Sequence, residues 1–181
     1  VAVQDGVVLV NNRPVKFKGV NRHDSSPYTG AVVSRMDAMF DLRIMKEANI
    51  NAIRTSHYPN APWFPELCSE YGFYMIAETD IESHGAAAIY GGSTEGTYSY
   101  FVQEPSYKKA ILDRVQRCVI RDKNQCSVIF WSLGNESYNG DTWADLGRLC
   151  KELDPSRLVH YEGDRDIPEV DVWSRMYRRV N

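Results

Sequence analysis

The sequence has no C-x-x-C pair and no regular cysteine spacing. Its four cysteines are Cys68, Cys118, Cys126 and Cys150. Such wide separation argues against both a disulfide framework and a zinc site. Three of the four fall inside apparent helices beside apolar residues. We therefore interpret the thiols as reduced core residues of a cytoplasmic protein.

Long apolar runs, excess positive charge and phosphate-binding glycine motifs are also missing. No segment approaches membrane-spanning length, so no membrane association is expected. The net charge is −3 and the basic residues are scattered apart from residues 175–179, which argues against a nucleic-acid partner. Without G-x-G-x-x-G or G-K-[ST], nucleotide binding is unsupported. The start lacks an initiator Met and a signal pattern, so we expect a chain cut from a longer protein.

What is present suits one globular core, because the 181 residues are 43% hydrophobic and 25% charged. Residues 7–10 and 14–17 around Asn11-Asn12 predict a hairpin, since Asn tolerates left-handed turn conformations. Beyond it, apolar runs predict strands. The candidate strands are residues 16–20, 52–56, 73–78, 127–133, 158–161 and 170–176.

Amphipathic segments separate these strands. Met36, Phe40 and Ile44 follow each other at four-residue spacing, and Ser34 with Asp37 predicts a capping box at the start of that helix. Two further helices are expected. One begins at Pro105 with residues 111, 115, 118 and 119 on one face, and the other carries residues 146, 149, 150 and 153.

Alternating strands and helices predict an α/β fold with a parallel sheet. Six strands suit either an open doubly wound sheet or a closed eight-stranded barrel. Residues 85–96 are rich in glycine and alanine, and we expect a long irregular loop there that helps to build a site. Only about ten residues separate the fifth and sixth strands, fewer than a helical crossover usually needs.

Polar residues follow every predicted strand. These endings are residues 21–24, 54–58, 78–84, 135–136, 161–162 and 177. Because parallel strands bring their carboxyl ends to one face, we expect these side chains to meet there. Glu136 ends the buried run 127–134, which is a typical place for a catalytic acid. The simpler interpretation is that Asn135 caps the next helix and Glu136 is an ordinary first-turn acid.

Glu82, His84 and Glu136 together have the composition of a divalent-cation site. Two carboxylates and one imidazole favour Mg²⁺ or Mn²⁺ over Zn²⁺. E-x-H is a short pattern, and a loop carboxylate paired with a local histidine is the plain alternative. Several aromatic residues are of a kind that stacks on sugars, although such residues more often belong to the core. They are Tyr58, Trp63, Trp131, Trp143 and Trp173.

Five ordered segments of the chain resemble a known family. They are residues 19–23 (GVNRH), 54–60 (RTSHYPN), 81–85 (IESHG), 129–136 (IFWSLGNE) and 159–164 (VHYEGD). Together they are similar to the catalytic domain of the large bacterial and fungal β-galactosidases of glycoside hydrolase family two. The resemblance implies a (β/α)₈ TIM barrel, here truncated after about strand six. Residues 1–13 would connect to a preceding β-sandwich domain, and residues 14–181 would form the first three quarters of the barrel.

The same resemblance implies roles for individual residues. Glu136 matches the general acid/base, and Asn135 matches a residue that binds the sugar 2-hydroxyl. Glu82 and His84, with Glu136, match Mg²⁺ ligands. The substrate contacts would be His23 and His57, with Arg54 supporting a second carboxylate and Tyr177 close to the nucleophile. Two segments depart from the usual pattern, namely 24–26 (DSS) and 77–79 (AET).

The implied activity is retaining hydrolysis of terminal β-D-galactose from galactosides such as lactose. The full-length enzyme is expected to contain further domains and to be a homo-oligomer. We expect the nucleophile to follow residue 181, so the 181-residue chain alone should be inactive, with Glu162 as the only rival nucleophile. Two alternatives stay open: a non-catalytic sugar-binding module, and a metal-dependent hydrolase that uses Glu82, His84 and Glu136.

Overall fold

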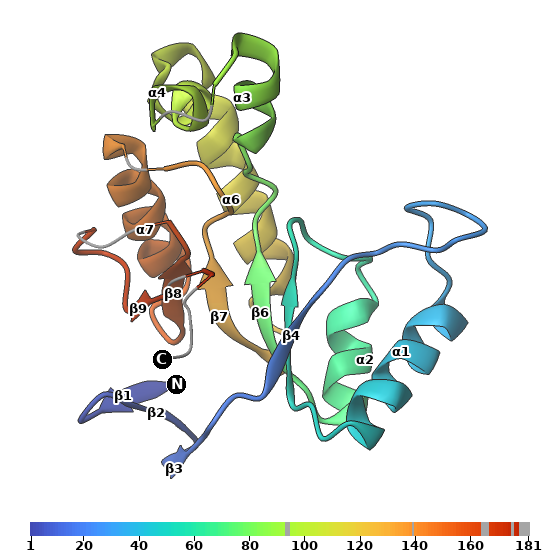
Figure 1. Cartoon of the computed structure of the whole chain (residues 1–181). Coiled ribbons are helices and arrows are strands. Elements are labelled where there is room, and N and C mark those ends of the chain that lie inside the picture. Colours follow the sequence, from blue (N-terminus) through green and yellow to red (C-terminus); the bar gives the residue numbers. More distant parts are fainter. Residues whose placement is uncertain (93–94, 139, 164–166, 175, 178–181) are drawn as a thin grey trace.

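The computed structural model describes residues 1–92, 95–138, 140–163, 167–174 and 176–177. One parallel sheet forms its centre (Figure 1). Its strands are β4 (Gly19–Arg22), β5 (Ala52–Thr55), β6 (Tyr74–Glu78), β7 (Val128–Ser132), β8 (Leu158–Tyr161) and β9 (Val172–Trp173). The spatial order is β4-β5-β6-β7-β8-β9, identical to the order in the chain. The described helices that pack against the strands lie on one face, as right-handed crossovers between sequential neighbours require, which is barrel topology and not a doubly wound sheet.

The helices lie around the outer side of this sheet (Figure 1). They are α1 (Arg35–Glu47), α2 (Phe64–Tyr71), α6 (Lys108–Asp122) and α7 (Asp141–Leu153). At the start of α1, Ser34 and Asp37 form the predicted capping box, in which each side chain bonds the backbone N–H of the other residue. The helix expected from Pro105 begins as a short 3₁₀ turn, η1 (Pro105–Tyr107), and continues as α6.

Two sequence expectations about the elements need correction, and one helix was missed. The segment 85–96 is not an irregular loop in its described part, since it contains helix α3 (His84–Tyr90) and the start of α4 (Glu95–Tyr98), followed by α5 (Tyr100–Gln103). Helix α2 was not predicted, because Pro65 and only eight residues hide its periodicity. On α1, the spaced apolar residues Met36, Phe40 and Ile44 are exposed, while Ala38 and Leu42 of the same helix are buried.

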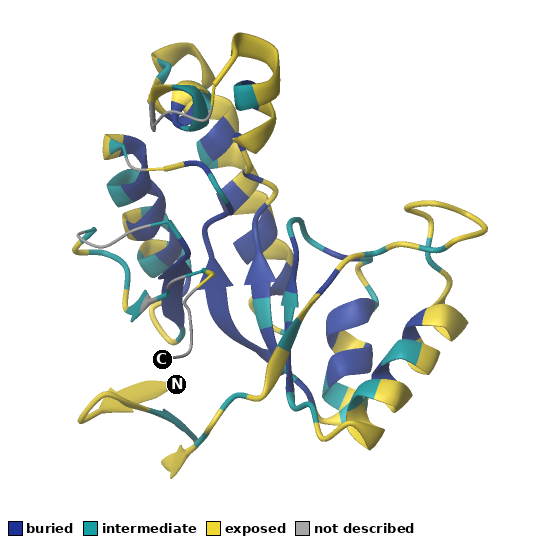
Figure 2. Cartoon of the chain, viewed as in Figure 1, coloured by how far each residue is buried: buried dark blue, intermediate teal, exposed yellow. Residues whose placement is uncertain are grey.

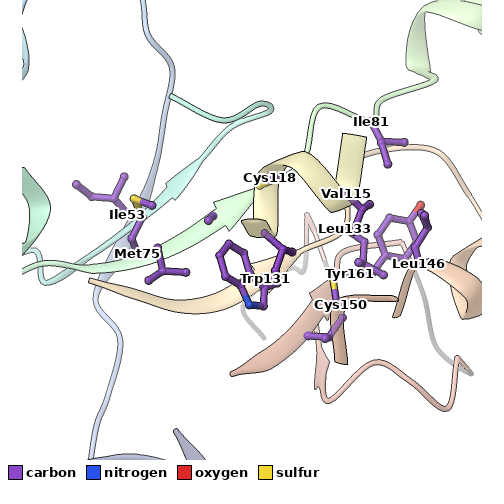
Figure 3. Packing of buried hydrophobic residues seen from close by; sticks show 14 of the residues in the cluster. Ile53, Met75, Ile81, Val115, Cys118, Trp131, Leu133, Leu146, Cys150 and Tyr161 are labelled. Atoms are coloured by element: carbon purple, nitrogen blue, oxygen red, sulfur yellow. The ribbon is translucent and has the colours of Figure 1, made fainter. Parts of the chain in front are cut away.

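Two apolar layers follow the alternation of side chains along the strands. The outer layer packs strand residues such as Met75 and Trp131 against helix residues such as Val115 and Leu146, as Figure 3 shows. In Figure 2 the central strands are accordingly dark blue. The inner layer centres on Phe130. Its other members are Ile129, Leu158, Val8, Val10, Phe17, Tyr74, Ile76 and Val172. Trp131 and Trp143 are core residues, as the simpler interpretation of the aromatic residues held.

The first residues form a three-stranded antiparallel meander of β1 (Ala2–Gln4), β2 (Val7–Val10) and β3 (Arg13–Pro14). Asn11 and Asn12 have φ of 51° and 61°, so the predicted hairpin turn is confirmed. Val8 and Val10 of β2, together with Phe17, pack on the inner layer. The meander therefore covers the amino end of the strands and leaves the carboxyl end for a site (Figure 1). The proposed link to a β-sandwich at residues 1–13 stays a prediction.

All four cysteines are free thiols. Cys68, Cys118 and Cys150 are buried in helices as expected, whereas Cys126 is exposed and not a core residue. Burial raises the pKa of Cys68 and of Cys118 to about 12, so these thiols stay protonated and unreactive. Among the described helices, none combines the length and the apolar character needed to cross a membrane.

Candidate active site

The polar residues that follow successive strands do meet at the carboxyl end of the sheet. The parallel register aligns β4 with β5 and β5 with β6, so Arg54 and Glu78 project toward the same end. Asn135 follows β7 and forms a parallel bridge with Glu82, which follows β6. Glu162 follows β8. The prediction of one common face at the strand ends is therefore confirmed for these five residues.

Glu136 lies between two other ionisable side chains. Its Oε2 is 2.6 Å from Nδ1 of His84, and its backbone N–H donates to Oε1 of Glu162 over 2.7 Å. The side chain of Glu136 keeps 21% of its surface exposed, so the carboxyl group can reach a bound molecule. Burial raises the pKa of Glu162, and the carboxylates of Glu136 and Glu78 act in the same direction, while the Glu136 N–H and the Arg54 guanidinium oppose it.

Glu82, His84 and Glu136 form the one group of potential metal ligands among the described residues. One ligand atom from each residue lies within 4.8 Å of the other two. The Asn135 amide donates from Nδ2 to Oε1 of Glu82 over 2.7 Å and so fixes one edge of this group. Mg²⁺ binds oxygen at about 2.1 Å, which separates opposite ligands by roughly 4 Å, so small movements would close these residues around an ion. The geometry and the oxygen-rich donor set fit a hard divalent cation.

Asn135 is held on both sides. Its Oδ1 accepts a hydrogen bond of 2.9 Å from Nη2 of Arg54, and its Nδ2 donates to Glu82. Because an amide oxygen only accepts and an amide nitrogen only donates, these two partners determine which way the side chain points. No partner for the second N–H of Nδ2 is found among the described residues. Asn135 is not a helix cap, since helix α7 begins at Asp141, after Gly140.

The two predicted substrate histidines lie together. The rings of His23 and His57 are 5.4 Å apart between centroids and meet edge to face. Tyr58 lies beside them, with its hydroxyl 3.5 Å from Nδ1 of His23. His57 Nδ1 is 2.6 Å from Oε1 of Glu78. The structure thus brings His23 and His57 to the same end of the sheet as Arg54, while their contacts with substrate stay a prediction.

Tyr177 lies in the pocket that also contains Glu136. This pocket has a volume of about 370 Å³. It is lined by Tyr98, Glu136, Tyr138, Glu162, Gly163, Met176 and Tyr177. Tyr177 is 88% exposed, so it borders the pocket without being fixed by packing. The prediction that Tyr177 lies in the candidate site is consistent with this position.

The sequence did not single out Glu78 as a site residue, although it marks a strand end. Its carboxylate is fully buried and contacts Arg54, His57 and Ser132. Ser132 in turn contacts the buried His160. Burial, followed by the Arg54 guanidinium, lowers the pKa of His160 to about 3. The useful signal was the period of two along β6, which places Glu78 on the inner face with Ile76.

The sheet is parallel and its strands follow the order of the chain, and its carboxylates gather at the carboxyl end, where the active sites of barrel enzymes lie. Residues 1–181 match the family model described as "Glycosyl hydrolases family 2, TIM barrel domain". The chain therefore belongs to this family, as the sequence resemblance indicated.

Curated relatives and solved structures agree with this assignment. A β-galactosidase of Actinobacillus pleuropneumoniae is 46% identical over 206 residues, which cover 98% of this chain and 20% of the relative. The β-galactosidase large subunit of Leuconostoc lactis is 45% identical and is matched over 29% of its length. A β-glucuronidase structure from Ruminococcus gnavus superposes with a TM-score of 0.81 at 26% identity, over 93% of this chain and 32% of that one. The chain thus spans less than a third of these relatives.

Proposed function

We propose that this domain carries the acid/base half of a retaining β-galactosidase site, which releases terminal β-D-galactose from galactosides such as lactose. The observation that supports this most is the partly exposed Glu136 carboxyl group, which follows the fourth strand of the sheet and borders a pocket of about 370 Å³. The curated relatives bear the name β-galactosidase, which favours galactosides among possible substrates.

In the proposed reaction, Glu136 protonates the glycosidic oxygen as the bond to the leaving group breaks. A second carboxylate, about 5 Å away, forms the glycosyl ester, and Glu136 then takes a proton from the attacking water. Asn135 would offer its remaining Nδ2–H to a sugar hydroxyl, because its other polar atoms are engaged by Arg54 and Glu82. His23 and His57 would contact further hydroxyls, and Tyr177 would border the reacting carbon.

We do not assign the second carboxylate to a described residue. Glu78 is fully buried and bonded by three side chains, so it cannot reach a sugar carbon. Glu82 belongs to the proposed cation group. Glu162 is bonded to the backbone N–H of Glu136 and lies beside it, whereas a nucleophile must face the acid across the sugar.

We further propose that Glu82, His84 and Glu136 bind Mg²⁺ or Mn²⁺, in keeping with their oxygen-rich donor set. A bound cation there would supply positive charge that favours the ionised form of nearby carboxyl groups. A metal-dependent hydrolase remains the second candidate function, because the same three residues could hold an ion with an open position. In that case a chelator should abolish activity, whereas the glycosidase proposal predicts only partial loss.

The protein produced from its complete gene is the material for the decisive test. We expect Glu136→Gln to lower kcat/KM by roughly 10²- to 10⁴-fold for galactosides with poor leaving groups, which need protonation. Galactosides with good leaving groups should be affected far less. Glu70→Gln, an exposed carboxylate on α2, is the matched control and should leave both substrates unchanged. Equal losses on both substrates for Glu136→Gln would contradict the acid/base role.

Other domains of the same protein, and a second copy of it, are the proposed protein partners. Support comes from the relatives, of which this domain covers only 20% to 29%. Size-exclusion chromatography with light scattering on the product of the complete gene would test the homo-oligomer.

A further inference from the structure

The Glu78 carboxylate is the centre of a buried hydrogen-bond network behind the candidate site. It lies at the end of β6 and is 0% exposed. Arg54 Nε–H and the Ser132 hydroxyl bond its Oε2, the latter over 2.6 Å, and His57 Nδ1 lies 2.6 Å from its Oε1. All three partners thus hold one carboxylate in one orientation.

The charge of Arg54 determines the direction of these hydrogen bonds. A guanidinium is always cationic, so the carboxylate that it contacts is stabilised as an anion, and an anionic carboxylate only accepts hydrogen bonds. The hydrogen between Glu78 and His57 therefore sits on Nδ1 of the histidine. When His57 is neutral, this N–H is the only one of its ring, and Nε2 keeps a lone pair.

The remainder of the network agrees with this direction. The Ser132 hydroxyl gives its only hydrogen to Glu78, so its oxygen accepts from His160 Nδ1 over 2.9 Å. His160 Nε2 then accepts from the Ser174 hydroxyl over 2.8 Å. Every donor of this hydrogen-bond network meets an acceptor when His160 is neutral, as its lowered pKa requires.

Nε2 of His57 is the free end of the network. No partner for it is present among the described residues, and the His57 side chain retains 19% of its surface exposed. We propose that Glu78 is a positioning residue that fixes His57 as a hydrogen-bond acceptor, so that a sugar hydroxyl donates to His57. This inference rests on the proposed function and assigns the polarity of one substrate contact.

Substrate analogues test this polarity directly. An aryl β-galactoside is compared with its 3-, 4- and 6-deoxy and deoxyfluoro analogues, in the wild-type protein from the complete gene and in His57→Ala. Fluorine accepts weakly and cannot donate, whereas hydrogen does neither. For the hydroxyl that contacts His57, we compare the loss of kcat/KM caused by His57→Ala. This loss should be about tenfold smaller with the deoxy and the deoxyfluoro analogue than with the parent galactoside. Comparing the same analogue in both proteins cancels the electronic effect of fluorine.

Replacing the Glu78 carboxylate by an amide should change Nε2 of His57 from a hydrogen-bond acceptor into a donor. In Glu78→Gln the Arg54 and Ser132 donors require the amide oxygen on their side, so the amide N–H₂ faces Nδ1 of His57. Nδ1 must then lose its hydrogen and Nε2 must gain it. In this variant, the ratio of kcat/KM for the deoxyfluoro analogue to kcat/KM for the deoxy analogue should be about tenfold higher than in the wild-type protein. Ser132→Ala keeps the acceptor for Nδ1 and is the control that should preserve the wild-type pattern.

The possible results distinguish a failure of this inference from a failure of the proposed function. The assigned polarity is overturned if the deoxyfluoro analogue loses as much kcat/KM on His57→Ala as the parent galactoside does. It is also overturned if no analogue reduces this loss. These measurements need no Glu78 variant, so a Glu78→Gln protein that does not fold leaves the result intact. Failure of the complete protein to hydrolyse the parent aryl galactoside would refute the proposed function itself.

Discussion

Gly134 couples the packing of the sheet to the position of the candidate acid. It joins β7 to Asn135 and has φ of +156°, which residues with a side chain rarely adopt. A Cβ at this position would lie 2.5 Å from the backbone oxygen of Ile81 and 3.3 Å from the ring of Trp143. The Ile81 oxygen cannot simply move away, because it accepts the backbone N–H of Asn135 over 2.9 Å.

The size of the effect of Gly134→Ala follows from these contacts. The added carbon must move by about 1 Å to reach an ordinary distance, and overpacking of this kind costs about 1–3 kcal/mol. The unfavourable φ adds about 1–3 kcal/mol. We therefore expect a destabilisation of about 2–6 kcal/mol. The movement displaces Asn135 and Glu136, and a displacement near 1 Å lowers kcat/KM by roughly 10²-fold.

Thermal unfolding and kcat/KM on an aryl galactoside measure the two consequences of Gly134→Ala in the protein from its complete gene. Gly96→Ala is the matched control. A Cβ on Gly96, within helix α4, meets no atom within 4 Å, so this variant should keep its activity and lose no stability. A Gly134→Ala protein with wild-type unfolding temperature and activity would refute the reasoning.

Two further perturbations test the far end of the sheet and the cation group. Burial alone would raise the pKa of Asp154, but hydrogen bonds from Ser156 and Arg157 lower it from 3.8 to about 2. Asp154→Asn should therefore cost about 2 kcal/mol above pH 4, and the difference should vanish as the pH falls through 2, as urea unfolding at several pH values would reveal. Glu82→Ala should weaken Mg²⁺ binding at least tenfold by calorimetry, and unchanged affinity would exclude Glu82 as a ligand.

The strands and the chemistry at their ends could be predicted because both depend on local sequence. Five of the six sheet strands lie within the ranges predicted from apolar runs. The exception is β4, which extends to Arg22, beyond the predicted end at residue 20. In the described part of its range, β9 is shorter than predicted and covers Val172–Trp173. Which face of α1 is buried could not be predicted, because the spacing of Met36 resembles a core face while only neighbours in space decide burial.

The network around Glu78 depends on register, which local sequence does not specify. Met75 on β6 pairs with Val128 on β7, but the next residue, Ile76, pairs with Phe130, because the register shifts by one at this point. Both Ile129 and Phe130 consequently join the inner apolar layer. The irregularity is therefore visible in packing as well as in pairing.

Without that shift, Glu78 would lie opposite Trp131, and the Trp131 side chain, which packs in the outer layer, would point inward beside it. With it, Glu78 lies opposite Ser132, which points inward and donates a hydrogen bond to the carboxylate. A one-residue slip exchanges the faces of all residues beyond it. The register shift thus places Ser132 beside Glu78, and the Glu78 carboxylate in turn supports Arg54 and His57. A site of this kind is specified by the pairing of strands, and therefore only by the folded chain.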